Sequence, residues 1–574
     1  MESSFNRRRA VMQPSCLVIS LLLIFSAANA TAQTAPNAGQ LLQQQPKPPA
    51  VAPAKPATIS PEAPEAAPTV QGPKVLVKGF RIKGAVLIPE SELVAQLQPA
   101  IGKELTLDQL RATAMLLTAY YAEKGYLARA ILPPQDIKDG IVEIQVIEGK
   151  RGNLNLNKEG ERINAARAQD FIDRRLPEGA PMNFAQLGEA LNILNEQPGV
   201  AAKADLKPGK NEGEIGLDVK VTEQPLITYS AGLNNHGSYG TGEIQANGSI
   251  TLNNPTGHFD AASLLLNESQ GSNYARVDYS AAAGDSGLRL GGYASYLDYH
   301  LIPSSFSALQ PKGRASTAGL AASYPWARRT DFNLSLTSSY DDSTLVDSTV
   351  AGETSNRHVG AFNLGMNGYT ISTRLGGVAS FGANFVSGNT DQLNATALAT
   401  DNTTRQVQGS FNKIGYNFGW LSSLPHDWKL NATLRGQIAG KNLDTSQQLI
   451  LGGPNGVRAY PVGEAAGDDG WLFNFDFGTQ LGDQLTGHLF YDLGGITLNH
   501  TLWANWNAGN PALPNTYTLS GVGAGMDWRI NPAFLFTASI ATPLGTNPGE
   551  DANHHNVDGY GNQARAWLSL NARF

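Results

Sequence analysis

The sequence is poor in cysteine, in charge and in long apolar runs. Its one cysteine among 574 residues is Cys16, and charged residues make up 16% of the chain, against about 25% in a typical soluble protein. Beyond residue 30, no stretch is apolar over the roughly 18 residues that a membrane helix needs. These absences exclude disulfide and iron–sulfur chemistry outside the N-terminus, disfavour an ordinary soluble enzyme, and leave β-strands as the means of crossing a membrane.

The chain also lacks the basic excess of nucleic-acid-binding proteins, because its formal net charge is −7. Two motifs resemble cofactor or metal sites, and neither has the expected context. The glycines of residues 521–525 lie within a predicted strand rather than between a strand and a helix. His554 and His555, with Asp551 and Asp558, lie in a predicted loop, where we expect them to be solvated. The sequence therefore predicts no enzymatic activity, cofactor, metal or nucleic-acid partner.

The N-terminus has the features of a secretory signal peptide. Three arginines at positions 7–9 precede an apolar run at 17–25, and small residues at 28–30 or 30–32 form a cleavage site. We predict a signal peptide at residues 1–32. The alternative, an uncleaved anchor, is disfavoured because the apolar run is short. Cleavage would remove Cys16 and leave an exported chain without cysteine.

Residues 33–73 are rich in proline and alanine, a composition that favours an extended, semi-rigid spacer. Within them, residues 39–45 can form a short helix, which would be marginal in water by itself and so needs a docking site. We predict a proline-rich linker that carries a short helix, and this helix is a candidate plug for a pore.

From residue 74 the composition becomes globular. Alternation typical of strands at 75–84 and 140–147 flanks helical periodicity at 89–97 and 107–124, which gives the order β-α-α-β-β. Three motifs, at residues 120–126, 133–137 and 140–149, closely resemble the POTRA domain of two-partner secretion transporters.

A second copy of this order follows, so we predict POTRA domains at residues 74–149 and 150–223. Their exposed strand edges can pair with an extended client chain by strand addition. The alternative is that the two domains only orient the rest of the molecule.

Residues 224–574 are predicted to form a transmembrane barrel of 16 antiparallel strands. Apolar and polar side chains alternate, as between 332 and 337, and the polar side chains are small and mostly uncharged, as a water-filled lumen allows. The predicted strands lie near 226–234, 241–252, 258–267, 272–283, 287–299, 314–324, 330–340, 356–369, 376–386, 405–418, 426–440, 469–481, 487–498, 518–529, 533–542 and 563–574.

The lengths of the connections support the barrel. Those after even-numbered strands are short, and those after odd-numbered strands from the fifth onward are expected to be long, which matches the short periplasmic turns and long surface loops of outer-membrane barrels. An even number of strands also returns both chain ends to the periplasm. The sixth surface loop is predicted at residues 441–468.

This sixth loop contains a single arginine, Arg458, between glycines that allow a tight backbone. Guanidinium cannot lose its charge, so it needs a partner if it is buried. Asp476 and Asp492 follow on the next two predicted strands, where the period of two places both on the lumen face. We therefore hypothesise that Arg458 holds the loop inside the barrel, so that its movement gates the lumen. The alternative is a solvated arginine on the surface.

The loop also resembles a motif of two-partner secretion transporters. Residues 451–453 followed by 457–460 are similar to the loop motif of this family, and residues 490–492 match its Phe-x-Asp strand motif. Further similarity lies at the strand junctions 237–242 and 324–329, so the resemblance extends over residues 74–574.

The resemblance implies which residues act in the loop. They are Val457, Arg458 and Tyr460, with Asp492 and Asp476 as acids. Ala459 replaces a glycine of the motif and would strain the loop if the position needs a positive φ. Asp476 stands where relatives often carry glutamate, which implies that Arg458 pairs chiefly with Asp492. The last strand ends on Phe574, which looks like the signal for insertion of outer-membrane barrels.

The expected function is that of an outer-membrane transporter with its POTRA domains in the periplasm. The resemblance implies that it captures an unfolded, largely β-helical exoprotein of the adhesin or haemolysin type and moves it through the barrel to the cell surface. Outer-membrane lipid and the barrel-assembly machinery are the other expected partners, and we expect a monomer. Two alternatives stay open: an insertase for outer-membrane proteins and a passive porin.

Overall fold

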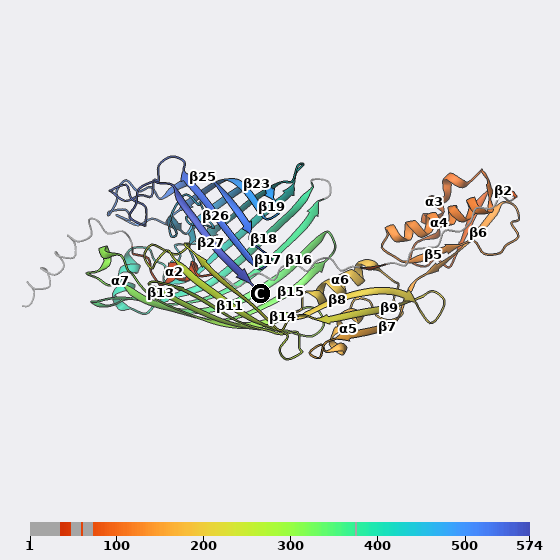
Figure 1. The fold of residues 1–574 in the computed structure, drawn as a ribbon, viewed down its shortest axis with the longest axis horizontal. Helices are drawn as coiled ribbons and strands as arrows, with labels where there is room; N and C mark the ends of the chain where they lie inside the picture. The colour runs from red at the N-terminus through yellow and green to blue at the C-terminus, as the bar shows by residue number, and fades with distance from the viewer. Residues whose placement is uncertain (1–34, 47–58, 61–72, 373–375) are drawn as a thin grey trace, which may run out of the picture.

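The computed structural model describes residues 35–46, 59–60, 73–372 and 376–574. A barrel and two small α/β domains follow one another along the longest axis of the molecule (Figure 1). The predicted signal peptide, with Cys16, and most of the predicted linker lie outside the described residues. Within the described part of the chain, no helix has both the length and the apolarity to span a membrane.

The first α/β domain has one helix pair packed on a three-stranded sheet, in the order β3-β6-β5, with β3 parallel and β5 antiparallel to β6. Helix α4 begins at Thr106, whose hydroxyl and the Gln109 side chain form a capping box. Its elements are β2 (Lys74–Leu76), β3 (Gly79–Lys83), α3 (Glu90–Leu97), the short 3-10 helix η2 (Gln98–Ala100), β4 (Glu104–Thr106), α4 (Leu107–Glu123), β5 (Ala128–Ile131) and β6 (Ile141–Glu148).

The second α/β domain repeats this arrangement with the order β7-β9-β8. Its outer edge is not fully exposed, contrary to the expectation from sequence, because β1 (Ile59–Ser60) pairs in parallel with β8 and places Ile59 opposite Ala204. The proline-rich composition predicts an extended, semi-rigid spacer, and an extended chain is able to pair with a strand in this way. The elements are β7 (Lys150–Glu159), α5 (Ala165–Asp173), α6 (Phe184–Asn195), β8 (Val200–Pro208) and β9 (Glu214–Glu223).

The C-terminal part is a closed antiparallel barrel of 16 strands, as predicted, in which β10 pairs with β27 to close the wall. The strands are β10 (Ile227–Asn234), β11 (Gln245–Asn253), β12 (Ala261–Ser269), β13 (Ser272–Ala282), β14 (Arg289–His300), β15 (Lys312–Arg328), β16 (Phe332–Thr349), β17 (Gly352–Ser372), β18 (Gly377–Gln392), β19 (Gly409–Ser423), β20 (Trp428–Ala439), β23 (Asp469–Gly482), β24 (Leu485–Thr497), β25 (Thr516–Arg529), β26 (Phe534–Pro543) and β27 (Arg565–Arg573).

Alternation along the strands separates a lipid-facing surface from a polar lumen. On β17, Phe362, Leu364 and Met366 are exposed on the outer face. Asn363, between them, faces inward and accepts a hydrogen bond from Asn384 of β18 at 3.2 Å. A wall of this kind exposes apolar side chains to lipid while every backbone group of a strand pairs with its neighbours.

The expectation of a long loop after the seventh strand is wrong. Strands β16 and β17 continue well beyond their predicted ends and meet in a turn of two residues, 350–351, instead of a long loop after the seventh strand. The long loop was expected because connections after odd-numbered strands from the fifth onward were predicted to be long, but the intervening residues pair as strands. They remain paired because a strand that rises above the apolar band needs no apolar outer face, and Leu345 still packs inside the lumen. Other surface loops contain η3 (Ser304–Phe306) and α7 (Ala395–Thr403).

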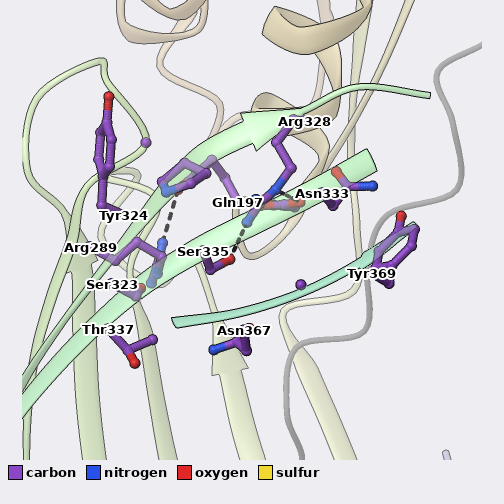
Figure 2. A pocket seen from close by; sticks show the side chains of 14 residues that line it. Gln197, Arg289, Ser323, Tyr324, Arg328, Asn333, Ser335, Thr337, Asn367 and Tyr369 are labelled. Atoms are coloured by element: carbon purple, nitrogen blue, oxygen red, sulfur yellow. Dashed lines mark hydrogen bonds and ion pairs between the residues drawn. The ribbon is translucent and has the colours of Figure 1, made fainter. Parts of the chain in front are cut away.

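The second α/β domain is attached to the barrel rim that carries the short turns. Arg328 of β15 donates a hydrogen bond from Nε to Glu196 at the end of α6 and another from Nη2 to Ser335 Oγ at 2.8 Å. Arg289 of β14 donates to Gln197 Oε1 at 2.9 Å. These side chains line a recess of about 290 Å³ (Figure 2), together with Ser323, Tyr324, Asn333, Thr337, Asn367 and Tyr369. Both arginines bind protein acceptors, so the recess is a joint between two parts of the chain.

Candidate gating site in the barrel lumen

Loop 6, residues 440–468, folds back into the barrel as a compact hairpin. Its base pairs β21 (Leu449–Ile450) with β22 (Ala466–Gly467). At the tip, Val457 N–H donates to Leu451 O at 2.7 Å, which brings Gly456 against Leu451. A Cβ on Gly456 would lie 1.8 Å from Leu451 O, so only glycine fits this turn.

The tip presents Arg458 to two acids on the barrel wall. Its Nε and backbone N–H both donate to Asp492 Oδ2 at 2.9 Å, and Nη2 donates to Asp492 Oδ1 at 2.7 Å. Nη1 donates to Asp476 Oδ1 at 2.8 Å. The guanidinium carbon also lies 3.5 Å from the ring centre of Phe490, a cation–π contact. Asp492 thus receives three of the four bonds from Arg458, and Asp476 receives one.

Burial makes this arrangement energetically strong. Asp492 is 0% exposed and the Arg458 side chain is 13% exposed. Asn474 lies on β23, opposite Asp492 of β24. It donates from Nδ2 to Asp492 Oδ1 at 2.7 Å and to Gly456 O at 2.8 Å. A buried carboxylate needs both a counter-charge and hydrogen bonds, and here loop 6 supplies the counter-charge while the wall supplies the acid.

Ala459 fits the loop without the strain that its replacement of glycine predicted. Among the described residues, those other than glycine with positive φ do not include Ala459. The space for its methyl group comes from Gly521 on β25, since a Cβ there would lie 2.5 Å from the Ala459 Cβ. Trp567 of β27 fixes the same segment by donating from Nε1 to Arg458 O at 2.7 Å.

Sequence reasoning missed this role of Gly521, although it placed residues 521–525 in a strand. Gly521, Gly523 and Gly525 all face the lumen, and added Cβ atoms at the last two would collide with Phe490 and His488. Glycine at every second position of a barrel strand was the available signal, because it marks a wall that something packs against closely.

The other predicted residues lie as follows. Val457 and Tyr460 are fully buried in the core of loop 6, where Tyr460 N–H donates to Val457 O at 3.0 Å and burial raises the pKa of the Tyr460 hydroxyl to about 12. Phe574 lies far along the chain, at the seam, where it stacks on Tyr229 with ring centres 5.0 Å apart and exchanges two backbone hydrogen bonds with it. Its part in insertion stays a prediction.

Loop 6 also contacts the last surface loop. Glu464 accepts hydrogen bonds from Asn547 Nδ2 and Val557 N–H, both at 2.9 Å, and its burial raises the pKa of the carboxyl to about 7. Asp558 in that loop is buried against Arg565 at 2.6 Å, so the expectation that it is solvated was wrong. The described residues contain no cluster of three metal-ligating side chains.

Helix α2 (Ala38–Gln43) lies inside the barrel (Figure 1). Asn37 caps it, and the Gln40 side chain completes a capping box. Ala38 and Leu41 pack into a cluster of lumen-facing apolar side chains, which are Leu297, Leu345, Val359, Val386, Phe411 and Leu443. The docking site that so short a helix needs is therefore the barrel wall itself.

A closed barrel with a lipid-facing wall, a lumen filled by its own loop and helix, and an arm of POTRA domains on the rim of short turns defines a protein of the bacterial outer membrane. Comparison with known proteins gives the family. The model for the haemolysin secretion/activation protein ShlB/FhaC/HecB matches residues 213–527, and that for the ShlB-type POTRA domain matches 75–149. The chain belongs to this family of two-partner secretion transporters, and its POTRA domains lie in the periplasm.

Relatives agree over most of the chain. The heme/hemopexin transporter protein HuxB of Haemophilus influenzae is 28% identical over 491 residues, which cover 83% of each chain. The outer membrane transporter CdiB of Dickeya dadantii is 23% identical over 70% of this chain and 72% of its own. The structure of CdiB from Escherichia coli matches 99% of this chain and 100% of its own with a TM-score of 0.68 at 20% identity, a likeness of fold.

Proposed function

We propose that this transporter takes up an unfolded exoprotein, one that folds into a β-helix, from the periplasm with its POTRA arm and passes it through the barrel to the cell surface. Loop 6 and helix α2 occlude the lumen at rest, and the client crosses once they give way. Val457, Arg458 and Tyr460 of the loop, with Asp492 and Asp476 of the wall, form the lock.

The observation that carries this proposal is the hold of Arg458 on Asp492. A loop that merely covered the mouth of a barrel would need no buried ion pair. Here the departure of the loop breaks the three side-chain bonds of Arg458 together, and loss of the Arg458 side chain alone would leave Asp492 buried without a counter-charge, a change that costs about 3–5 kcal/mol. The lumen therefore has a defined closed state, and a client must break the contact between Arg458 and Asp492 to open it.

Capture by the arm is supported by its sheets. The first POTRA sheet ends in the short strand β5, and the second has its β8 edge paired for only two residues. An unfolded chain can add to such edges through backbone hydrogen bonds and so be held in extended form. Folding of the client outside the cell can then supply the free energy for its passage.

The test is deletion of residues 74–223 in the full-length protein. The client is first identified as the secreted protein that is missing from the culture medium of cells lacking this transporter. We expect its secretion to be lost in the deletion variant while the barrel still inserts and keeps its heat-modifiable mobility on gels. Unchanged secretion would refute capture by the arm, and a fall in the levels of many barrel proteins would favour an insertase.

A further inference from the structure

Helix α2 and the root of loop 6 meet at a second buried ion cluster. Arg357, on the lumen face of β17, donates Nη2 to Asp347 Oδ2 and Nη1 to Asp444 Oδ2, each at 2.7 Å. Asp347 belongs to the barrel wall, whereas Asp444 belongs to loop 6. All three side chains are buried. One guanidinium therefore balances two carboxylates, which would otherwise repel each other strongly because no water screens them.

The helix takes part in the same cluster. The backbone N–H of Ala38 donates to Asp347 Oδ1 at 2.8 Å. Thr445, next to Asp444 in loop 6, accepts from Arg357 Nη1 at 2.9 Å and donates from its hydroxyl to Asn37 Oδ1 at 2.8 Å. The start of the helix is thus joined to the wall through Asp347 and to loop 6 through Thr445.

Helix and loop are also in direct van der Waals contact. A Cβ on Gly39 would lie 2.5 Å from Thr445 Oγ1 and 2.7 Å from Ser446 N, so no side chain fits between them. Further along the helix, Gln43 Nε2 donates to Thr445 O at 2.6 Å. Movement of Thr445 or Ser446 would therefore disturb the helix directly.

We propose that Arg357 is a positioning residue that couples the two occluding elements. It holds the root of loop 6 and, through Asp347 and Thr445, the start of helix α2, so the release of either element weakens the hold on the other. This inference rests on the proposed role of both elements in closing the lumen. Coupling of this kind is reciprocal, because each element must change the release of the other by the same factor.

The test measures exposure of the helix in the full-length protein, in a Cys16→Ser, Leu41→Cys background. Leu41 is 2% exposed, so reaction of the introduced thiol with a water-soluble maleimide reports release of the helix. Asp444→Asn is the decisive variant, because within the described structure the Asp444 side chain bonds to Arg357 and Ser446 rather than to the helix. We expect Asp444→Asn and Arg357→Gln to raise the labelling rate by roughly 5- to 150-fold.

Arg276→Gln is the matched control. Arg276 also faces the lumen, but it pairs with Asp278 of its own strand and stacks on Tyr293, 3.7 Å from the ring centre. Its labelling rate should equal that of the parent. Arg357→Lys, which keeps the charge, should restore part of the protection, whereas a merely structural lesion would not be rescued by charge.

The reciprocal measurement uses Leu451→Cys, at a fully buried position of loop 6 outside the cluster that packs on the helix, with and without residues 35–46. Deletion of the helix should raise labelling there by the same factor. Labelling at Leu41→Cys that Asp444→Asn leaves unchanged would overturn the proposal. If Arg357→Gln does not fold, Asp444→Asn decides by itself, because it removes a carboxylate partner of Arg357 without removing a bond to the helix. None of these rates depends on secretion, so they stand or fall separately from the transport proposal.

Discussion

The lumen site and the joint between the second POTRA domain and the barrel both bury an arginine against a carboxylate, but the other partners of the two arginines differ. Arg458 lies on loop 6, and its side-chain hydrogen bonds go to Asp492 and Asp476 on the wall. Arg328 lies on the wall and donates to two main-chain carbonyls and one hydroxyl of its own β15–β16 hairpin, besides Glu196. All side-chain hydrogen bonds of Arg458 cross from loop 6 to the barrel wall. Only one side-chain hydrogen bond of Arg328 crosses from the barrel to the POTRA domain.

This difference indicates how each contact behaves when it opens. Departure of loop 6 separates every ion-pair bond of Arg458 at once, so the lumen should have two distinct states. Separation of the POTRA domain leaves Arg328 with three of its hydrogen bonds, so this ion pair by itself should not define two states of the joint. Bistable contacts suit a gate.

The strongest way to break the comparison is Arg458→Ala. It removes three side-chain hydrogen bonds and leaves Asp492 buried without a counter-charge while the loop stays in place, so we expect the closed state to lose about 3–5 kcal/mol of stability. Protease sensitivity of loop 6 and ion conductance in planar bilayers should both rise sharply. A double-mutant cycle with Asp492→Asn should be strongly non-additive, and additive effects would rule out a direct pair.

A pH dependence should appear on the lumen side alone. Burial raises the pKa of Glu464 to about 7, above its ordinary 4.5. Its protonated form is therefore favoured in the closed state, and the stability it contributes is full below pH ~4.5 and is lost as the pH rises through ~7, by up to about 3 kcal/mol. Conductance should rise over this range.

Glu464→Gln is the control for this pH dependence. The amide cannot ionise, so the rise in conductance between pH ~4.5 and ~7 should become much smaller. A rise that survives in Glu464→Gln would assign the dependence to another group.

The packing of Ala459 against Gly521 sharpens the comparison further. Gly521→Ala would place two methyl groups 2.5 Å apart, and overpacking of this kind costs about 1–3 kcal/mol. Conductance should rise, while Gly482→Ala, where an added Cβ meets no atom within 4 Å, should change nothing.

The reverse substitution Ala459→Gly should rescue Gly521→Ala, because it returns the lost space. Failure of this rescue would show that Gly521 matters for a reason other than Ala459. A successful rescue would separate local packing from any general weakening of β25.

The smallest effect is expected at the joint. Glu196→Gln keeps one acceptor for Arg328, whose other bonds persist, so we expect a loss of about 1 kcal/mol or less. Spin-label distances between the POTRA arm and the barrel should broaden slightly without a second population. A distinct second population would contradict the contrast with loop 6.

Much of the fold followed from local pattern. Alternation with a period of two and short turns after even-numbered strands predicted the barrel. The β-α-α-β-β order predicted the α/β domains of the arm, which the resemblance of three motifs identified as POTRA domains. Asp476 and Asp492 could be placed on the lumen face because alternation decides sidedness without any tertiary knowledge. Two expectations failed. The rule of long connections after odd-numbered strands does not hold at the turn 350–351. Polarity was taken as exposure for Asp558, which is buried against Arg565.

The sequence by itself determined that a strand barrel exists, which side chains face its lumen and that one arginine of loop 6 has acids within its reach. Only the tertiary structure decided how space and charge are shared between distant segments: Gly521 making room for Ala459, Arg357 balancing Asp347 with Asp444, and helix α2 filling the lumen. The reason is that periodicity is a property of neighbours along the chain, whereas fit and charge balance depend on segments hundreds of residues apart meeting in one closed interior.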